Sequence, residues 1–196
     1  MEGYHGTNSD IADKILASGF ELKTNPNNLP NDLGNGIYIF LDNDLYTKSA
    51  YEMAKSFIEV FRKEVFRKRD LNDKFSVLQI QISEEGRYID YNDINSQIAF
   101  EKFRNENYDK ILKHYDSFCY KSNYGGSTKN LPGKLKRANL DGIIFELLKN
   151  KANIDGVMKD TYTPQDAKYK KSSFFNGREF CLYNTSLIEE ISIIEN

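Results

Sequence analysis

The sequence predicts an α+β fold, and three observations lead to that prediction. Short segments rich in β-branched and aromatic residues are dispersed along the chain, for example at 37–41 and 75–82. A long segment between these two has apolar residues at three-to-four spacing, which predicts an amphipathic helix. The chain has neither regular strand–helix alternation nor a glycine-rich Rossmann or P-loop signature, so a doubly wound parallel sheet is not expected.

The N-terminal elements are predicted from local signals. Residues 3–7 predict a short strand that runs into a loop. Asn8 or Ser9 has the side chain of a helix N-cap, and Gly19 supplies the C-terminal stop of the helix that follows. Residues 23–36 are rich in Asn, Pro and Gly, so they predict a loop.

A strand at 37–41 precedes the long helix, and a second strand at 75–82 follows it. Asp42 or Asp44 is the expected N-cap of the helix, which is predicted to run to about Lys68. Its apolar stripe consists of Ala50, Met53, Ala54, Phe57, Ile58, Phe61 and Val65.

The second half of the chain predicts a helix over 92–120 and a connector over 121–137. Residues 1–196 are expected to form one domain, in which 92–137 is an insertion or specificity element. The remaining expectations are a buried strand within 140–148, short strands at 156–158, 180–184 and 187–194, and a polar loop over 159–178.

Composition excludes several classes of function. The net charge of −2 indicates no global attraction to nucleic acid or to an anionic membrane. The two cysteines are far apart and the chain has two histidines, so no metal site is expected. No apolar stretch reaches membrane-spanning length, and the N-terminus lacks a secretory signal. The expected site of action is therefore the cytosol, with export by a dedicated secretion system left open.

Three residues are candidates for chemistry, and each also has an ordinary structural interpretation. His5 lies beside a glycine at the end of a predicted strand, where a ligand can approach the backbone, although a histidine near a terminus is often a surface residue. Tyr38 lies in a predicted strand, where tyrosines usually pack in the core. Glu179 precedes an apolar strand, where a charge is either functional or protects a sheet edge.

The segments around these residues resemble three motifs of one enzyme superfamily. Residues 4–7, Tyr-His-Gly-Thr, resemble the first motif of the ADP-ribosyltransferases related to diphtheria toxin and the poly(ADP-ribose) polymerases. Residues 36–40 and 47–51, Gly-Ile-Tyr-Ile-Phe and Thr-Lys-Ser-Ala-Tyr, resemble the second motif. Residues 179–184, Glu-Phe-Cys-Leu-Tyr-Asn, resemble the third. The motifs occur in the order found in that family and span almost the whole chain.

This resemblance implies a split β-sheet fold with an NAD cleft and a helical insertion. It implies that His5 binds the adenosine ribose and that the backbone of Gly6 binds the nicotinamide carboxamide. Tyr38 would form a wall beside the nicotinamide, Tyr51 would stack on that ring, and Ser49 would donate to the carboxamide. The complete implied NAD-binding set is His5, Gly6, Thr7, Gly36, Tyr38, Ser49 and Tyr51.

By the same resemblance, Glu179 is the catalytic carboxylate. It would bind the 2′-hydroxyl of the nicotinamide ribose and stabilise the oxocarbenium character that develops as the glycosidic bond breaks. NAD is a co-substrate in this reaction, and no metal is required. Gly177 occupies the position at which the arginine-modifying branch carries Glu or Gln, so arginine is a less favoured acceptor.

The acceptor is expected to contact the loop before Glu179. This loop combines basic and aromatic residues, which can meet phosphates and stack on bases, so both a nucleic acid and a protein are candidate acceptors. An ordinary solvated lysine face is the simpler explanation of the same residues. The candidate contacts are Lys170, Lys171, Phe174, Phe175, Asn176 and Arg178.

Other functions are compatible with the same residues. Water as the acceptor would make the chain an NAD glycohydrolase, and loss of turnover would leave a non-catalytic NAD- or partner-binding module. A metal-free ribonuclease toxin using His5 or His114 is a fourth candidate. The small stand-alone size fits a bacterial or phage toxin, for which an antitoxin or other inhibitor protein is a candidate partner.

Overall fold

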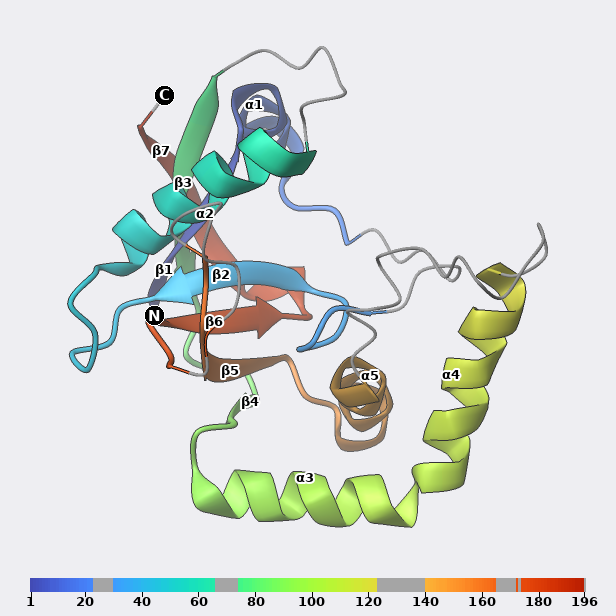
Figure 1. Cartoon of the computed structure of the whole chain (residues 1–196). Helices are drawn as coiled ribbons and strands as arrows, with labels where there is room; N and C mark the ends of the chain where they lie inside the picture. Colours follow the sequence, from blue (N-terminus) through green and yellow to red (C-terminus); the bar gives the residue numbers. More distant parts are fainter. Residues whose placement is uncertain (23–29, 66–73, 123–139, 165–171, 173, 196) are drawn as a thin grey trace.

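The computed structural model describes residues 1–22, 30–65, 74–122, 140–164, 172 and 174–195 (Figure 1). Within these residues, five α-helices accompany one seven-stranded sheet, which confirms the α+β prediction. No helix among them has both the length and the apolar character needed to cross a membrane. The strands are β1 (Glu2–Asn8), β2 (Ile37–Leu41), β3 (Phe75–Ile82), β4 (Tyr88–Asp90), β5 (Gly156–Thr161), β6 (Gly177–Leu182) and β7 (Ile188–Glu195). The helices are α1 (Ser9–Ser18), α2 (Ala50–Val65), α3 (Ile94–Glu106), α4 (Tyr108–Ser122) and α5 (Leu140–Ala152).

The sheet opens between the neighbouring strands β2 and β1. The strand order is β4-β5-β6-β2-β1-β3-β7, with one parallel pair, β4 and β5. β1 pairs with β3 over its whole length, whereas its ladder with β2 consists of the pairs Gly3–Leu41 and Tyr4–Phe40. Beyond Tyr4 the strands diverge, and Figure 1 shows β2 and β6 running at a steep angle to β1 and β3. This divergence creates space between the two halves of the sheet.

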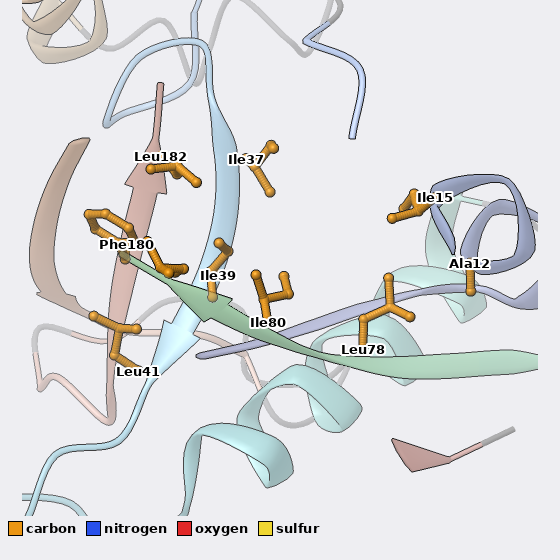
Figure 2. Packing of buried hydrophobic residues seen from close by; sticks show 10 residues of the cluster. Ala12, Ile15, Ile37, Ile39, Leu41, Leu78, Ile80, Phe180 and Leu182 are labelled. Carbon is orange, nitrogen blue, oxygen red and sulfur yellow. The ribbon is translucent and has the colours of Figure 1, made fainter. Parts of the chain in front are cut away.

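Alternation along β2 divides the core between the two faces of the sheet. Ile37, Ile39 and Leu41 face a cluster covered by α1, while Tyr38 and Phe40 face the opposite side. Figure 2 shows the first cluster, to which β3 contributes the side chains of Leu78 and Ile80 from one face. Its buried members are Ala12, Ile15, Ile37, Ile39, Leu41, Leu78, Ile80, Ile82, Phe180 and Leu182.

The predicted signals at both ends of α1 are confirmed. The Asn8 side chain accepts a hydrogen bond from the Asp10 amide at 3.1 Å, which makes Asn8 the N-cap. Gly19 ends the helix with φ of 77°, a conformation that residues with a Cβ rarely adopt, and its N–H donates to the Ile15 carbonyl at 2.7 Å.

The start of α2 differs from the prediction. The helix begins at Ala50, and Ser49 and Glu52 form a reciprocal capping box: the Glu52 amide donates to Ser49 Oγ at 3.3 Å, and the Ser49 amide donates to Glu52 Oε2 at 2.9 Å. The prediction of Asp42 or Asp44 as the N-cap is therefore wrong, although Asp42 still accepts from the Ala50 amide at 2.7 Å. The predicted end of this helix lies outside the described residues.

The predicted strand within 140–148 is wrong, because this segment forms α5. Its consecutive Ile143, Ile144 and Phe145 are all buried, and a short apolar run cannot distinguish a buried strand from a buried helix. Helix-favouring residues continue to Ala152, and two lysines lie in the last turn. Length and propensity therefore favour the helix.

Three other boundaries differ from the predictions. The helix expected over 92–120 is two helices, since the Asn107 side chain donates to the Phe103 carbonyl at 2.8 Å and ends α3. The short strand β4 was not predicted. The loop expected over 159–178 is shorter, because β5 and β6 extend into both of its ends. Residues 123–137 of the predicted connector lie outside the described part of the chain.

Candidate functional site

A cleft of about 260 Å³ lies where β1 and β2 diverge. It brings together His5, Tyr38 and Glu179, which come from β1, β2 and β6 and are far apart in the sequence. Its complete lining is His5, Gly6, Asn31, Asp32, Tyr38, Phe40, Phe57, Thr161, Tyr162, Thr163, Pro164 and Glu179.

His5 bridges the opening between the strands. Its Nδ1 lies 2.8 Å from the backbone carbonyl of Tyr38, and since a carbonyl oxygen can only accept, Nδ1 carries the proton. The ring also meets Phe20 edge-on, with 5.3 Å between the ring centroids. Burial lowers the pKa of His5, which favours the neutral ring at pH 7. In that tautomer, Nε2 is a hydrogen-bond acceptor suited to a hydroxyl.

Gly6 lets the backbone of β1 approach α2. A Cβ at this position would lie 2.2 Å from the carbonyl oxygen of Ala54 and 3.1 Å from Cβ of Ile58. Glycine is therefore required by packing alone, and its small size also brings the strand backbone to the surface of the cleft.

Tyr38 lines the cleft with its ring and anchors a loop with its hydroxyl. The hydroxyl accepts from the Leu33 amide at 2.9 Å and lies within donating distance of the Gly34 carbonyl at 3.1 Å and Asp32 Oδ1 at 3.4 Å. Burial raises the pKa of Tyr38 far above its usual value, so the hydroxyl stays protonated. Tyr38 thereby fixes the turn that brings Asn31 and Asp32 into the cleft.

The same turn is held from its other side. Tyr183 donates to the carbonyl oxygen of Leu33 at 2.5 Å, and Glu146 of α5 accepts from the amide of Asn35 at 2.6 Å. Helix α5, which the sequence analysis assigned to a strand, thus supports one wall of the cleft. Neither Asn31 nor Asp32 was predicted from the sequence, since a loop composition alone does not show which residues face a site.

Glu179 enters the cleft from the middle of the sheet. It lies between Phe40 of β2 and Lys159 of β5 in the strand register, and it is half-buried. Thr163, which is 2% exposed, donates from Oγ1 to Glu179 Oε1 at 3.2 Å. Thr163 lies in no recognisable motif, so it was not predicted from the sequence.

The structure does not place Tyr51 or Ser49 in the cleft. Tyr51 packs edge-on against Tyr4, with 6.1 Å between ring centroids, and it is Phe57 that reaches the cleft from α2. Ser49 donates from its hydroxyl to Glu52 at 3.0 Å as part of the capping box. The expected stacking and carboxamide roles of Tyr51 and Ser49 therefore lack support in this arrangement.

Thr7 and Gly36 also lie outside the cleft lining. Thr7 is buried within β1. Gly36 lies against β6, where a Cβ would be 2.6 Å from both Cys181 Sγ and the Leu182 carbonyl oxygen. Both positions support the strands that carry His5 and Tyr38.

The two described aromatic residues of the expected acceptor loop are exposed. Phe174 is 84% exposed and Phe175 is 56% exposed. The next residue, Asn176, donates its amide N–H to the carbonyl of the cleft residue Thr161 at 2.9 Å. Phe174 and Phe175 therefore lie next to the cleft. Lys170 and Lys171 lie outside the described residues.

Asn176 and Arg178 make internal contacts. The Asn176 side chain accepts from the Thr163 amide at 2.8 Å and donates to the Thr163 carbonyl at 2.9 Å. Arg178 donates from Nε to Asp160 at 2.7 Å, on the face of the sheet opposite to Glu179. The prediction that Arg178 contacts an acceptor at the cleft therefore disagrees with this geometry, because strand alternation turns its side chain away.

The cleft combines negative charge with aromatic rings. Its described lining includes the carboxylates of Asp32 and Glu179 and contains no lysine or arginine. Four of its aromatic side chains are Tyr38, Phe40, Phe57 and Tyr162. This surface suits a planar ligand that carries or develops positive charge. Among the described residues, no group of three or more His, Cys, Asp or Glu side chains is arranged to hold a metal ion.

Comparisons with known proteins found no match, either to a protein-family model or to a curated protein. The case for a function therefore depends on the residues and geometry of the cleft.

Proposed function

We propose that this chain is an NAD-dependent ADP-ribosyltransferase with a split-sheet fold of the ADP-ribosyltransferase type. It moves ADP-ribose from NAD to a macromolecular acceptor and releases nicotinamide. The observation that carries the proposal is the convergence of His5, Tyr38 and Glu179 on one cleft, in the three motifs that resemble that family. The cytosol, expected from the sequence, is the proposed site of action.

The charge of the cleft fits the reacting half of NAD. The nicotinamide ring of NAD is a planar cation, and the ribose acquires positive charge as the glycosidic bond breaks. Glu179 supplies a fixed negative charge for that transition state, and Tyr38 and Phe57 offer ring faces to the nicotinamide. The cleft of about 260 Å³ is smaller than the roughly 300–1,000 Å³ of sites that enclose a drug-sized ligand. It therefore accommodates the nicotinamide ribose, with the adenosine half at the open side.

Two further contacts follow from the divergence of the strands. The β1–β2 ladder ends at Tyr4, so an amide of the ligand can approach the backbone of Gly6 where a strand would otherwise lie. Neutral His5 presents Nε2 as an acceptor for a hydroxyl of the adenosine ribose, which is the contact that the family resemblance implies. The residues present thus fit NAD without any metal.

The test is turnover of NAD labelled in its adenosine half, in the presence of a cell lysate. Wild type is expected to release nicotinamide and to transfer label. The isosteric Glu179→Gln variant is expected to lower the rate by about 10²-fold or more, because it removes the charge aimed at the transition state. Glu190→Gln, an exposed glutamate on β7, is the matched control and is expected to retain wild-type rates.

The outcomes separate the competing functions. Equal activity of wild type and Glu179→Gln contradicts the proposal. Nicotinamide release without a labelled macromolecule indicates an NAD glycohydrolase, and NAD binding without turnover indicates a non-catalytic module. Digestion of the labelled product with nuclease or protease identifies the class of acceptor. RNA cleavage without NAD indicates a ribonuclease.

The exposed pair Phe174 and Phe175 is the proposed contact for the acceptor. Replacing both with alanine is expected to reduce label transfer while nicotinamide release to water continues. Ile94→Ala, at a residue that is 63% exposed on α3, is the control for loss of exposed apolar surface. Equal label transfer by the double variant and wild type contradicts this role. A dedicated inhibitor protein is a proposed partner if the chain acts as a toxin.

A further inference from the structure

A buried threonine connects the acceptor loop to the carboxylate in the cleft. Thr163 follows β5 and donates from Oγ1 to Glu179 Oε1 at 3.2 Å. It is 2% exposed, so its hydroxyl occupies a fixed position inside the protein. A hydrogen bond from a fixed donor selects one orientation of a carboxylate and orients its oxygens.

The backbone of Thr163 is itself clamped by Asn176. The carboxamide of Asn176 accepts from the Thr163 amide at 2.8 Å and donates to the Thr163 carbonyl at 2.9 Å, which uses both functional groups of the side chain. The amide of Asn176 is bonded to Thr161 of β5 at 2.9 Å. These contacts hold Thr163 and Asn176 against each other and hold Asn176 against the end of β5.

We propose that Thr163 is a positioning residue for Glu179, and that Asn176 acts through Thr163. This inference rests on the proposed function, in which Glu179 binds the nicotinamide ribose and stabilises its positive charge. Thr163 holds the carboxylate in the orientation that the transition state requires. Asn176 was expected from the sequence to contact the acceptor. In this proposal it instead holds Thr163 in place, and so affects the release of nicotinamide from NAD.

The experiment measures kcat and KM for nicotinamide release, with water as the acceptor. Thr163→Val keeps the shape of the side chain and removes its donor, so kcat is expected to fall about 10- to 100-fold, as is typical of small misplacements of catalytic groups. KM for NAD is expected to change little. Thr163→Ser restores the donor and is expected to restore most of kcat. Thr185→Val, at a half-buried threonine in the short 3-10 helix Thr185–Leu187 that follows β6, is the matched control.

Asn176→Ala provides a second variant. It is expected to lower kcat in the same direction as Thr163→Val even when no macromolecular acceptor is present. Wild-type kcat in both Thr163→Val and Asn176→Ala overturns the inference. A Thr163→Ser variant as slow as Thr163→Val also overturns it, because the loss would then come from packing.

Crystal structures of wild type and Thr163→Val test the inference without turnover. The Glu179 carboxylate is expected to leave its wild-type position when the donor is removed. An unchanged carboxylate overturns the inference. If wild type releases no nicotinamide, the proposed function fails, and the pair of crystal structures still decides whether Thr163 orients Glu179.

Discussion

Tyr38 and Tyr183 hold the two polar backbone groups of a single residue, Leu33. The Leu33 amide donates to the Tyr38 hydroxyl at 2.9 Å, and its carbonyl accepts from the Tyr183 hydroxyl at 2.5 Å. Leu33 is fully buried, so both backbone groups depend on these partners. The turn that presents Asn31 and Asp32 to the cleft is therefore fixed both from β2, which carries Tyr38, and from Tyr183, which directly follows β6.

Removing either hydroxyl is expected to destabilise the protein and loosen that turn. Tyr38→Phe leaves a buried N–H without its partner, at a cost of about 1–3 kcal/mol in the free energy of unfolding. Tyr183→Phe has the same effect on the carbonyl of Leu33. Because both act on Leu33, the double variant is expected to depart from additivity by roughly 0.5–3 kcal/mol. Urea unfolding of the four proteins measures this coupling, and simple additivity contradicts it.

Elements could be predicted from the sequence where the residues that determine them lie within or next to the element. Asn8 and Gly19 act on the helix they border, so both ends of α1 were predictable. The consecutive apolar residues Ile143–Phe145 have no period, so the sequence could not distinguish a buried strand from α5.

The candidate site divides in the same way. His5, Tyr38 and Glu179 lie in motifs and were predicted, and the structure brings them to one cleft. Thr163 reaches Glu179 from the other side of the loop between β5 and β6, and Asp32 lies in a turn that Tyr38 holds, so no local pattern marks either residue.

Stability at acid pH is expected to depend on His5. Burial lowers its pKa in the folded chain from the usual 6.5, so the unfolded chain binds more protons as the pH falls below that value. Its contribution to stability is complete above about pH 6.5 and is lost as the pH falls toward the folded-state pKa. His5→Asn removes this term, so its melting temperature should fall less between pH 7 and pH 5 than that of wild type.

His114→Asn is the control for that experiment. His114 is the other histidine of the chain and is exposed on α4. Comparing the two variants separates the effect of the cleft position from the effect of replacing a histidine. A His5→Asn profile that parallels wild type would show that His5 does not control acid stability.

Ser49 is expected to affect stability and not the binding of NAD. Its hydroxyl accepts from the Glu52 amide at 3.3 Å in the capping box, so Ser49→Ala should lower the free energy of unfolding by about 0.5–2 kcal/mol. Ser49→Thr retains both the capping oxygen and the hydroxyl that donates to Glu52, so it should remain close to wild type. KM for NAD is expected to be unchanged in both variants. A large rise in KM for Ser49→Ala alone would instead support the carboxamide contact that the family resemblance implies.

Arg178 is expected to stabilise the sheet without selecting the acceptor. It donates from Nε to Asp160 at 2.7 Å, and the two side chains are 21% and 9% exposed. Arg178→Ala leaves Asp160 nearly buried without this partner. The guanidinium retains some contact with water, so the cost is expected to stay below that of breaking a fully buried ion pair. The expected loss in the free energy of unfolding is about 1.5–3 kcal/mol, the range for hydrogen bonds to charged groups.

Arg104→Ala is the matched control for Arg178→Ala. Arg104 lies 3.5 Å from Glu101 on the surface of α3, with both side chains well exposed, so its replacement should cost at most about 1 kcal/mol. Urea unfolding compares the two losses. At a temperature where Arg178→Ala is folded, label transfer per nicotinamide released should equal that of wild type, because the guanidinium lies on the face of the sheet opposite to Glu179. A selective loss of transfer would return Arg178 to the acceptor site.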